Sequence, residues 1–129
     1  MFEEWTYFRV ERRGDVTVVM PTVSDLFGLV VNSELRKELI RFVQGETPGK
    51  VVVDFHHIQR FSTDWITTLI SLKKRIGTGG EIELCSMQPL QRKIFRELNL
   101  DGTVFQILEN VNEAVQSLSS FLQRVQNHD

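Results

Sequence analysis

Two hydroxyl groups and a carboxylate stand together at Ser62, Thr63 and Asp64, directly before an apolar run with helical spacing. The first turn of a helix exposes unpaired N–H groups and carries partial positive charge, so it stabilises an anion. One hypothesis is a cap, in which Ser62 or Thr63 accepts an N–H bond and Asp64 complements the helix dipole, with a gain of about 1 kcal/mol. The other is a regulatory site, because phosphorylation of a hydroxyl here would add about −1.5 to −2 charge units without disturbing the fold.

Enzymatic chemistry finds little support in the other residue patterns. The chain has no G-x-x-x-x-G-K-[ST] loop, and the glycines of "IGTGGEIEL" precede a strand, opposite to the order of a dinucleotide site. The single cysteine, Cys85, lies in an apolar strand, which predicts a buried thiol. His56 and His57 are adjacent, and we expect them to point to opposite faces of a strand, so they predict no metal site. Asp54 without a partner base specifies no reaction, and a small-ligand site using Asp54 is the least supported reading. We therefore predict no enzyme, no cofactor and no metal.

Length and composition fit one soluble domain over residues 1–129. The net charge is −2, which counts against nonspecific nucleic-acid binding. No stretch approaches the roughly 18 apolar residues of a membrane span, and the acidic, aromatic start does not resemble a secretory signal. The lone cysteine fits a reducing compartment. These features predict a cytoplasmic protein that binds neither nucleic acid nor membrane.

The elements that must position Ser62 and Thr63 alternate along the chain. Residues 5–23 predict a hairpin that turns at 13–15, and residues 50–55 predict a strand buried on both faces. A helix is expected from Asn32 or Ser33 as cap to Gly45, and a second from Thr63 to the glycines at 77–80, with one broad apolar face that includes Trp65, Leu69 and Leu72. After a strand at 81–87 comes a third helix, whose predicted buried stripe is Leu90, Ile94, Phe95 and Leu98. A strand at 103–108 and a helix capped near Asn110 complete an α/β fold with partly parallel pairing. The predicted inner face of this last helix consists of Ala114, Val115, Leu118, Phe121, Leu122 and Val125.

In order and spacing, these segments resemble the STAS domain, the family of anti-sigma factor antagonists. The resemblance extends from about Asp15 through Leu122. Asp54 matches the aspartate that ends a strand in the family pattern, Phe61 matches its apolar residue, and Gly79-Gly80 matches its glycine pair. The resemblance implies a single α/β domain with a mixed sheet of about five strands packed with about four helices.

The family motif Asp-Ser-Ser-Gly opens the helix, and a serine kinase phosphorylates a hydroxyl within it. In strict register, Ser62 replaces the motif Asp, Thr63 the first Ser, Asp64 the second Ser and Trp65 the Gly. A carboxylate at the usual acceptor position cannot be phosphorylated by a serine kinase and carries about half the charge of a phosphoserine. Three interpretations stay open: Asp64 imitates the phosphorylated state, Thr63 or less favourably Ser62 is the acceptor, or the switch has been lost.

The resemblance therefore implies a non-catalytic regulatory domain that binds an anti-sigma factor or a serine/threonine kinase in partner switching. We expect partner-binding residues at Asp54, Phe61 and Trp65, although the helical position of Trp65 also fits a core role. Thr63 is the preferred phosphoacceptor. A solvated surface explains the basic residues at 73–75 better than a partner face does. The alternative is a constitutive scaffold or homodimer in a signalling assembly without a phosphorylation switch.

Overall fold

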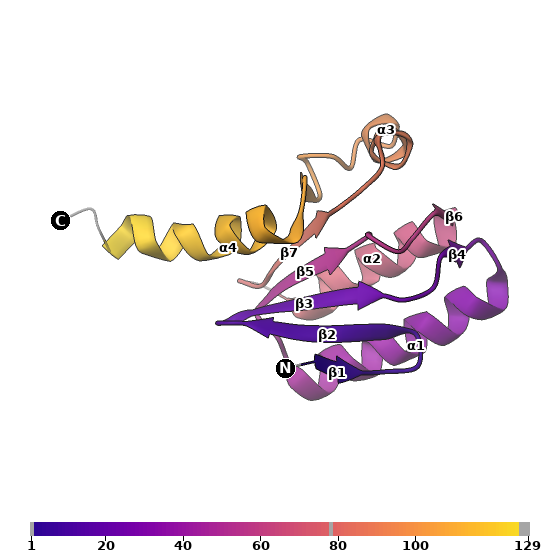
Figure 1. Cartoon of the computed structure of the whole chain (residues 1–129), viewed down its shortest axis with the longest axis horizontal. Coiled ribbons are helices and arrows are strands. Elements are labelled where there is room, and N and C mark those ends of the chain that lie inside the picture. The colour runs from indigo at the N-terminus through magenta and orange to yellow at the C-terminus, as the bar shows by residue number, and fades with distance from the viewer. Residues whose placement is uncertain (1, 78, 127–129) are drawn as a thin grey trace.

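A six-stranded mixed sheet forms the centre of the molecule (Figure 1). The computed structural model describes residues 2–77 and 79–126, with side chains described for residues 3–77 and 79–119. The strands follow one another in space in the order of the sequence: β1 (Phe2–Glu4), β2 (Phe8–Arg13), β3 (Val16–Pro21), β5 (Lys50–Asp54), β7 (Glu81–Cys85) and β8 (Gln106–Leu108). The predicted α/β class with a mixed sheet is confirmed.

The sheet begins with an antiparallel hairpin and continues with parallel strands. β2 and β3 pair from Phe8 opposite Pro21 to Arg13 opposite Val16, and Gly14 in the turn has a φ of 61°. This positive φ favours glycine, which explains the residue at the turn. β3, β5, β7 and β8 then pair in parallel, each with the next. The predicted hairpin and the predicted parallel pairing are both confirmed.

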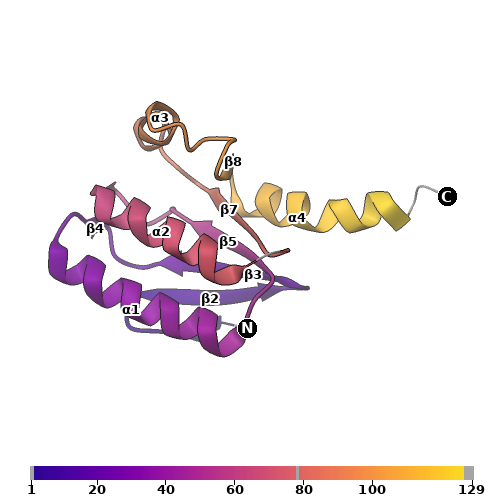
Figure 2. The same cartoon turned by 180° about the vertical axis from the view of Figure 1, so that it is seen from behind.

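Four helices connect or follow the strands: α1 (Leu29–Glu46), α2 (Thr63–Ile76), α3 (Pro89–Glu97) and α4 (Val111–Gln126). Figure 2 shows α1 and α2 lying in front of the strands on one face of the sheet. The residues of β5 divide between two cores, as expected for a strand buried on both faces. Val51 and Val53 belong to the core under α1 and α2, whereas Val52 packs with Ala114 and Leu118 of α4.

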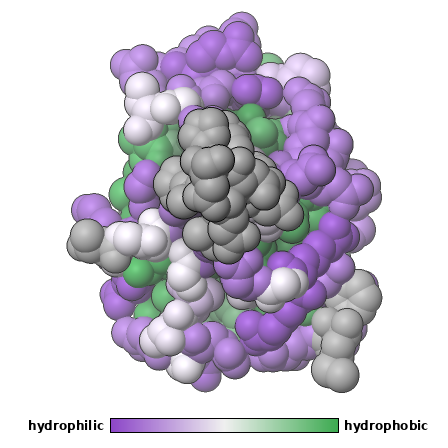
Figure 3. Space-filling view, turned by 90° about the vertical axis from the view of Figure 1, so that its left-hand side faces the viewer, coloured by the Kyte–Doolittle hydropathy of each residue, from purple (hydrophilic) through white to green (hydrophobic). Residues whose placement is uncertain are grey.

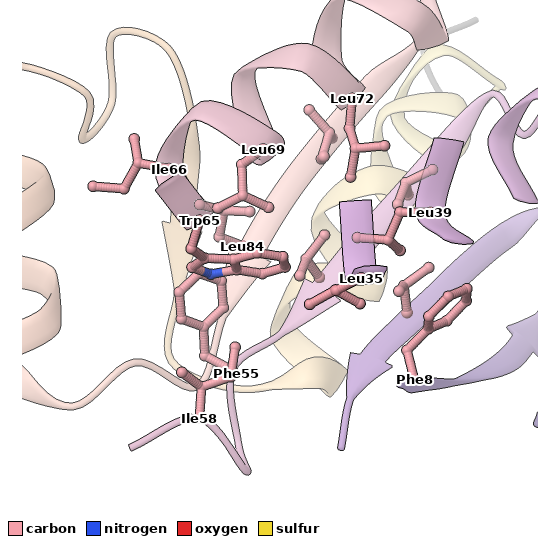
Figure 4. Close-up of a cluster of buried hydrophobic side chains, with 14 of the residues drawn as sticks. Phe8, Leu35, Leu39, Phe55, Ile58, Trp65, Ile66, Leu69, Leu72 and Leu84 are labelled. Carbon is pink, nitrogen blue, oxygen red and sulfur yellow. The ribbon is translucent and has the colours of Figure 1, made fainter. Parts of the chain in front are cut away.

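The larger core centres on Trp65, which is fully buried between α2 and the sheet (Figure 4). Leu35 and Leu39 of α1 and Leu69 and Leu72 of α2 are buried in the same cluster. Their spacing of three and four residues puts them on the inner side of each helix. The predicted inner face of α2 is therefore confirmed.

Two helix predictions need correction. α1 begins at Leu29, about one turn before the predicted start, with Gly28 at the N-cap position. Asn32 is thus inside the helix and does not cap it, and Gly45 does not end it. In α3, Phe95 is fully buried, but Leu90 is 69%, Ile94 36% and Leu98 49% exposed. The predicted buried stripe of α3 is confirmed at Phe95 and wrong at Leu90, Ile94 and Leu98, because this helix packs inward through Gln91 and Phe95.

α4 begins as predicted. The side-chain oxygen of Asn110 accepts a hydrogen bond of 2.9 Å from the N–H of Glu113, three residues into the helix. Ala114 and Leu118 are buried against the sheet, as expected for its inner face. The remaining predicted inner side chains, Phe121, Leu122 and Val125, lie outside the described side chains.

Two surface findings complete the fold. The end of the molecule seen in Figure 3 is mostly hydrophilic, with small hydrophobic areas among the polar residues. Within residues 2–77 and 79–126, no helix has both the length and the apolar character needed to cross a membrane.

Candidate functional site

A short second sheet places the starts of α1 and α2 side by side. Its two strands, β4 (Asp25–Leu26) and β6 (Arg60–Phe61), pair in parallel, and each leads into one of the helices. The carbonyl oxygen of Leu26 accepts hydrogen bonds from the N–H of Ser62 at 3.1 Å and from Nδ2 of Asn32 at 2.8 Å. One backbone carbonyl therefore ties both helix starts together.

Ser62 occupies the N-cap position of α2, but its side chain does not cap the helix. Its Oγ is buried and has no hydrogen-bond partner among the described atoms. The predicted cap bond is therefore absent at Ser62, although the residue's position at the helix start is as predicted. Thr63 and Asp64, the first two residues of the helix, are both exposed. The two candidate acceptors thus differ sharply in access to solvent.

A groove of about 210 Å³ lies between α1 and α2 and reaches the start of α2. Its walls carry both charges, Arg36 from α1 and Asp64 from α2. Asn32 lines its floor, with a side-chain Oδ1 that is buried and unpartnered among the described residues. The remaining lining residues are mainly hydroxyl-bearing: Leu29, Ser33, Thr67 and Thr68. The groove therefore offers a hydrogen-bond acceptor, hydroxyls and one charge of each sign to a polar segment.

An exposed apolar patch that was not predicted from the sequence adjoins this groove. Phe27 is 54%, Leu29 76% and Val30 77% exposed, and we call these three residues the Phe27 patch. The guanidinium carbon of Arg60 lies 4.6 Å from the centre of the Phe27 ring, and its Nε lies 3.0 Å from the carboxylate of Asp25. Clusters of exposed apolar residues are typical of protein-binding surfaces. The apolar run at 26–31, which no predicted strand or helix buried, was the available signal.

Phe61 and Trp65 lie beneath this surface. Their ring centroids each lie 6.0 Å from that of Phe55, and the ring centroid of Phe61 also lies 5.9 Å from that of Phe95. Trp65 has no exposed surface and Phe61 is 8% exposed. A partner cannot touch the ring of Trp65, so the expected direct contact with this residue is corrected to a supporting role. The aromatic cluster holds the start of α2 rigidly against the sheet.

Asp54 is separated from the other predicted site residues by the sheet itself. It lies on the α4 face of β5, buried, with Oδ1 accepting a 3.0 Å hydrogen bond from the N–H of His56. The same oxygen lies 4.0 Å from Sγ of Cys85. The structure therefore does not bring Asp54 together with Phe61 and Trp65, and it gives Asp54 the role of shaping the turn after β5.

The predicted placement of the two histidines is wrong, whereas the predicted burial of the cysteine is confirmed. His56 and His57 lie in that turn with their ring centroids 4.9 Å apart, so the expectation of opposite faces of a strand is wrong. No group of three or more potential metal ligands occurs within the described part of the chain. Cys85 is buried as predicted, and this burial raises the pKa of its thiol to about 12. A thiol with such a pKa is not a nucleophile at neutral pH.

The basic residues near the end of α2, at 73–75, are exposed, in agreement with the predicted solvated surface. Nζ of Lys73 donates a hydrogen bond to the carbonyl of Val104 and lies 5.6 Å from the ring centre of Phe105. Lys73 is exposed but engaged within the domain, and Lys74 and Arg75 are exposed as well.

The start of α2 has the chemistry of a recognition surface: an exposed hydroxyl, a carboxylate, a polar groove and an apolar patch.

Comparisons with known proteins agree with this geometry. A family model described as the STAS domain matches residues 7–114. No curated protein sequence matches the chain significantly. Among solved structures, the chain is similar to an anti-sigma-factor antagonist (STAS) domain protein from Planctomyces limnophilus, with 24% identity and a TM-score of 0.77. That match covers 87% of this chain and 97% of the other.

Two further structures share the fold at lower identity. One is a putative anti-sigma factor antagonist from Thermotoga maritima, with 17% identity, a TM-score of 0.75, and coverage of 85% of this chain and 92% of that one. The other is the Bacillus cell fate determinant SpoIIAA in its phosphorylated form, with 16% identity, a TM-score of 0.59, and coverage of 86% and 98%.

Proposed function

Because the chain belongs to the STAS domain family, we propose that it is a non-catalytic, cytoplasmic protein-binding domain that acts in partner switching with an anti-sigma factor or a serine/threonine kinase. We further propose that phosphorylation of Thr63 controls this binding. The observation that carries the proposal is the exposed position of Thr63 at the start of α2, next to Asp64, which lines the polar groove together with Leu29 of the Phe27 patch.

Access to solvent favours Thr63 over Ser62 as the acceptor. A kinase must bring the hydroxyl oxygen of its substrate close to the γ-phosphate of its nucleotide. That oxygen must therefore be accessible from outside the protein. The Oγ of Ser62 is buried, and the Ser62 N–H is bonded to Leu26, so this residue would have to move before it reacted. Thr63 needs no such movement.

The charge of a phosphate at Thr63 would change the surface that a partner meets. Phosphorylation adds about −1.5 to −2 charge units beside Asp64, which already carries one negative charge. The helix N-terminus offsets part of this charge, so the fold tolerates the modification. The combined charge would repel a partner that docks an acidic or apolar segment on the groove and the Phe27 patch. The modification thus acts on binding and leaves the fold intact.

The exposed carboxylate of Asp64 supports the second candidate, a constitutive scaffold without a switch. No ion pair to this side chain occurs among the described residues. Its charge is therefore fully presented at the position where the family carries its acceptor. If Asp64 substitutes permanently for a phosphate, a partner that prefers the unmodified family surface is excluded at all times.

The experiment that separates these candidates is affinity capture from the native host's lysate, with mass spectrometry of the captured proteins and of residues 62 and 63 of the bait. The proposed switch predicts an anti-sigma factor or kinase among the captured proteins and phosphate on Thr63. Binding of that purified partner is then measured by calorimetry to Thr63→Glu and to the charge-matched control Gln116→Glu, at an exposed position of α4, which packs on the opposite face of the sheet.

We expect Thr63→Glu to weaken binding at least tenfold and Gln116→Glu to leave it unchanged. The same partner with an unmodified bait, and stronger binding after Asp64→Ser, would favour the scaffold with a fixed charge. Phosphate on Ser62 alone would overturn the assignment of Thr63. Capture of no regulatory protein under any condition would overturn the proposed function.

A further inference from the structure

The outer side of α3 carries a line of large apolar side chains that no described residue covers. Leu90, Ile94 and Leu98 are spaced by four residues and are 69%, 36% and 49% exposed. Side chains at this spacing lie on one side of a helix. Figure 1 shows α3 almost end-on at the margin of the molecule, away from the other helices. We call these three residues the α3 stripe. It belongs to a different element from the Phe27 patch and from the start of α2.

The inner side of α3 is fixed firmly to the domain. Nε2 of Gln91 donates hydrogen bonds to the carbonyls of Ile58 at 2.9 Å and Gln59 at 3.2 Å, while its Oε1 accepts one of 3.0 Å from the N–H of Gln88. Phe95 has no exposed surface and packs against Phe55 and Phe61. These contacts fix the orientation of α3 on the domain, so the α3 stripe stays exposed to solvent.

Opposite charges flank the stripe on one side. Lys93 and Glu97 are one turn apart, and their side chains are 63% and 65% exposed. Within one chain they lie 3.9 Å apart, which makes a weak surface pair. A two-fold rotation centred on Ile94 would reverse the direction of the helix and place this flank beside itself. Lys93 would then lie opposite Glu97 of a second copy, and Leu90 opposite Leu98 of that copy.

From this self-complementarity we propose that two copies of the chain pair through α3 in an antiparallel arrangement, with Ile94 on the two-fold axis. Each apolar side chain of the stripe meets an apolar one, and each flanking charge meets its opposite, which is the condition for an isologous interface. The same complementarity of apolar groups and charges argues for a second copy as the occupant. The proposal is independent of phosphorylation at Thr63 and of the partner bound at the start of α2.

The face of one short helix is smaller than a standard protein interface, so the dimer is weak. Stable interfaces bury roughly 1,200–2,000 Å² in total, and smaller ones are transient. We therefore expect a dissociation constant on the order of 10 µM or higher. Such a dimer forms when the local concentration of the chain is high.

Sedimentation equilibrium of the full chain, from micromolar to near-millimolar concentration, tests the proposal. The wild type is expected to shift from the mass of one chain toward that of two. Ile94→Glu places two carboxylates on the axis and is expected to abolish the shift. Val30→Glu, the matched change in the Phe27 patch, is expected to leave it unchanged. Circular dichroism and thermal unfolding verify that each variant is folded.

A mixing experiment tests the antiparallel register. Lys93→Glu and Glu97→Lys are each expected to weaken self-association about fivefold or more, because each replaces two attractive pairs across the axis with two repulsive ones. An equimolar mixture of the two variants is expected to restore association, since unlike charges then face each other between chains. The pairs within each chain stay repulsive in the mixture, so restoration reports contacts between copies.

Three outcomes would overturn the proposal. A wild-type chain that stays monomeric at every concentration removes the dimer itself. Loss of the dimer in Val30→Glu but not in Ile94→Glu moves the interface to the Phe27 patch. Failure of the mixture to restore association, with both single variants folded, rejects the antiparallel register.

Discussion

Nδ2 of Asn32 donates a hydrogen bond of 2.8 Å to the carbonyl oxygen of Leu26, the same atom that accepts the N–H of Ser62. A second bond of 2.8 Å joins the same amide group to the carbonyl of Gly28. Asn32 therefore links the loop before α1 to the start of α2 from a position that is 5% exposed.

Asn32→Ala should lower the free energy of unfolding by about 1–2 kcal/mol, because it removes two buried hydrogen bonds. Urea unfolding followed by circular dichroism measures the change. Ser33→Ala, its exposed neighbour, should stay within about 0.5 kcal/mol of the wild type. Equal stability of the two variants would show that Asn32 does not hold the helix starts together.

Gly80 should not tolerate a side chain. A Cβ at this position would lie 2.1 Å from Cγ2 and 3.0 Å from the carbonyl oxygen of Ile76, and the backbone oxygen cannot move away. We expect Gly80→Ala to cost about 1–3 kcal/mol in the free energy of unfolding. Gly49→Ala is the control, because nothing lies within 4 Å of its Cβ. Ile76→Ala should recover part of the loss in a double variant, since it removes Cγ2.

Glu83 should make stability fall as pH rises. It is 6% exposed, its Oε1 accepts a 2.9 Å hydrogen bond from Ser117, and its Oε2 has no partner among the described residues. Burial raises the pKa of this carboxyl above its ordinary 4.5, against the opposing effect of the Ser117 bond. The folded state thus favours the protonated form. Its contribution to stability is fully present below the unfolded-state pKa and is lost as pH rises through the folded-state pKa.

Glu83→Gln removes this titration. We expect it to raise the free energy of unfolding at pH 7 by about 1–2 kcal/mol, with a gain that shrinks toward pH 4. Urea unfolding across this range checks the result, with Glu34→Gln, at an exposed position of α1, as the control. A gain that does not depend on pH would reject the buried ionised carboxylate as its cause.

The thiol of Cys85 should resist alkylation in the folded protein. It is fully buried, and its pKa of about 12 leaves almost no thiolate at pH 8. Iodoacetamide should therefore label the native chain far more slowly than the chain in urea, as measured by intact mass. Ser33→Cys, at an exposed position, provides a reactive reference within the same fold. Rapid native labelling at Cys85 would indicate that α4 opens from the sheet.

The spacing of apolar residues predicted those strands and helices whose buried residues can be recognised from their own sequence. β5 reads as a continuous apolar run, and α2 places Trp65 and Leu69 on one side, so both were predictable. β4 and β6 have two residues each and no pattern of their own. They exist because backbone bonds from Gln59 and Arg60 reach the carbonyl of Ser24. Pairing of this kind depends on tertiary structure and leaves no local signal.

The candidate site was predictable in position but not in detail. The hydroxyls at 62 and 63 marked the start of α2, yet the burial of one and the exposure of the other follow from the bond between Ser62 and Leu26. In α3, Leu90 and Phe95 are both apolar, and the sequence does not show which side faces the domain. The hydrogen bonds from Gln91 to the carbonyls of Ile58 and Gln59 fix which side of α3 faces the domain.

The six strands of the main sheet lie in space in the order in which they occur in the chain. No strand has to be inserted between two that formed earlier, and each parallel strand after β3 joins an edge that the preceding segment has already created. Among the strands of residues 2–77 and 79–126, the pairings between segments close in sequence are those of β1, β2 and β3, so the hairpin can form first while the rest of the chain is still being synthesised. Translation from the N-terminus and growth of the sheet therefore proceed in the same direction.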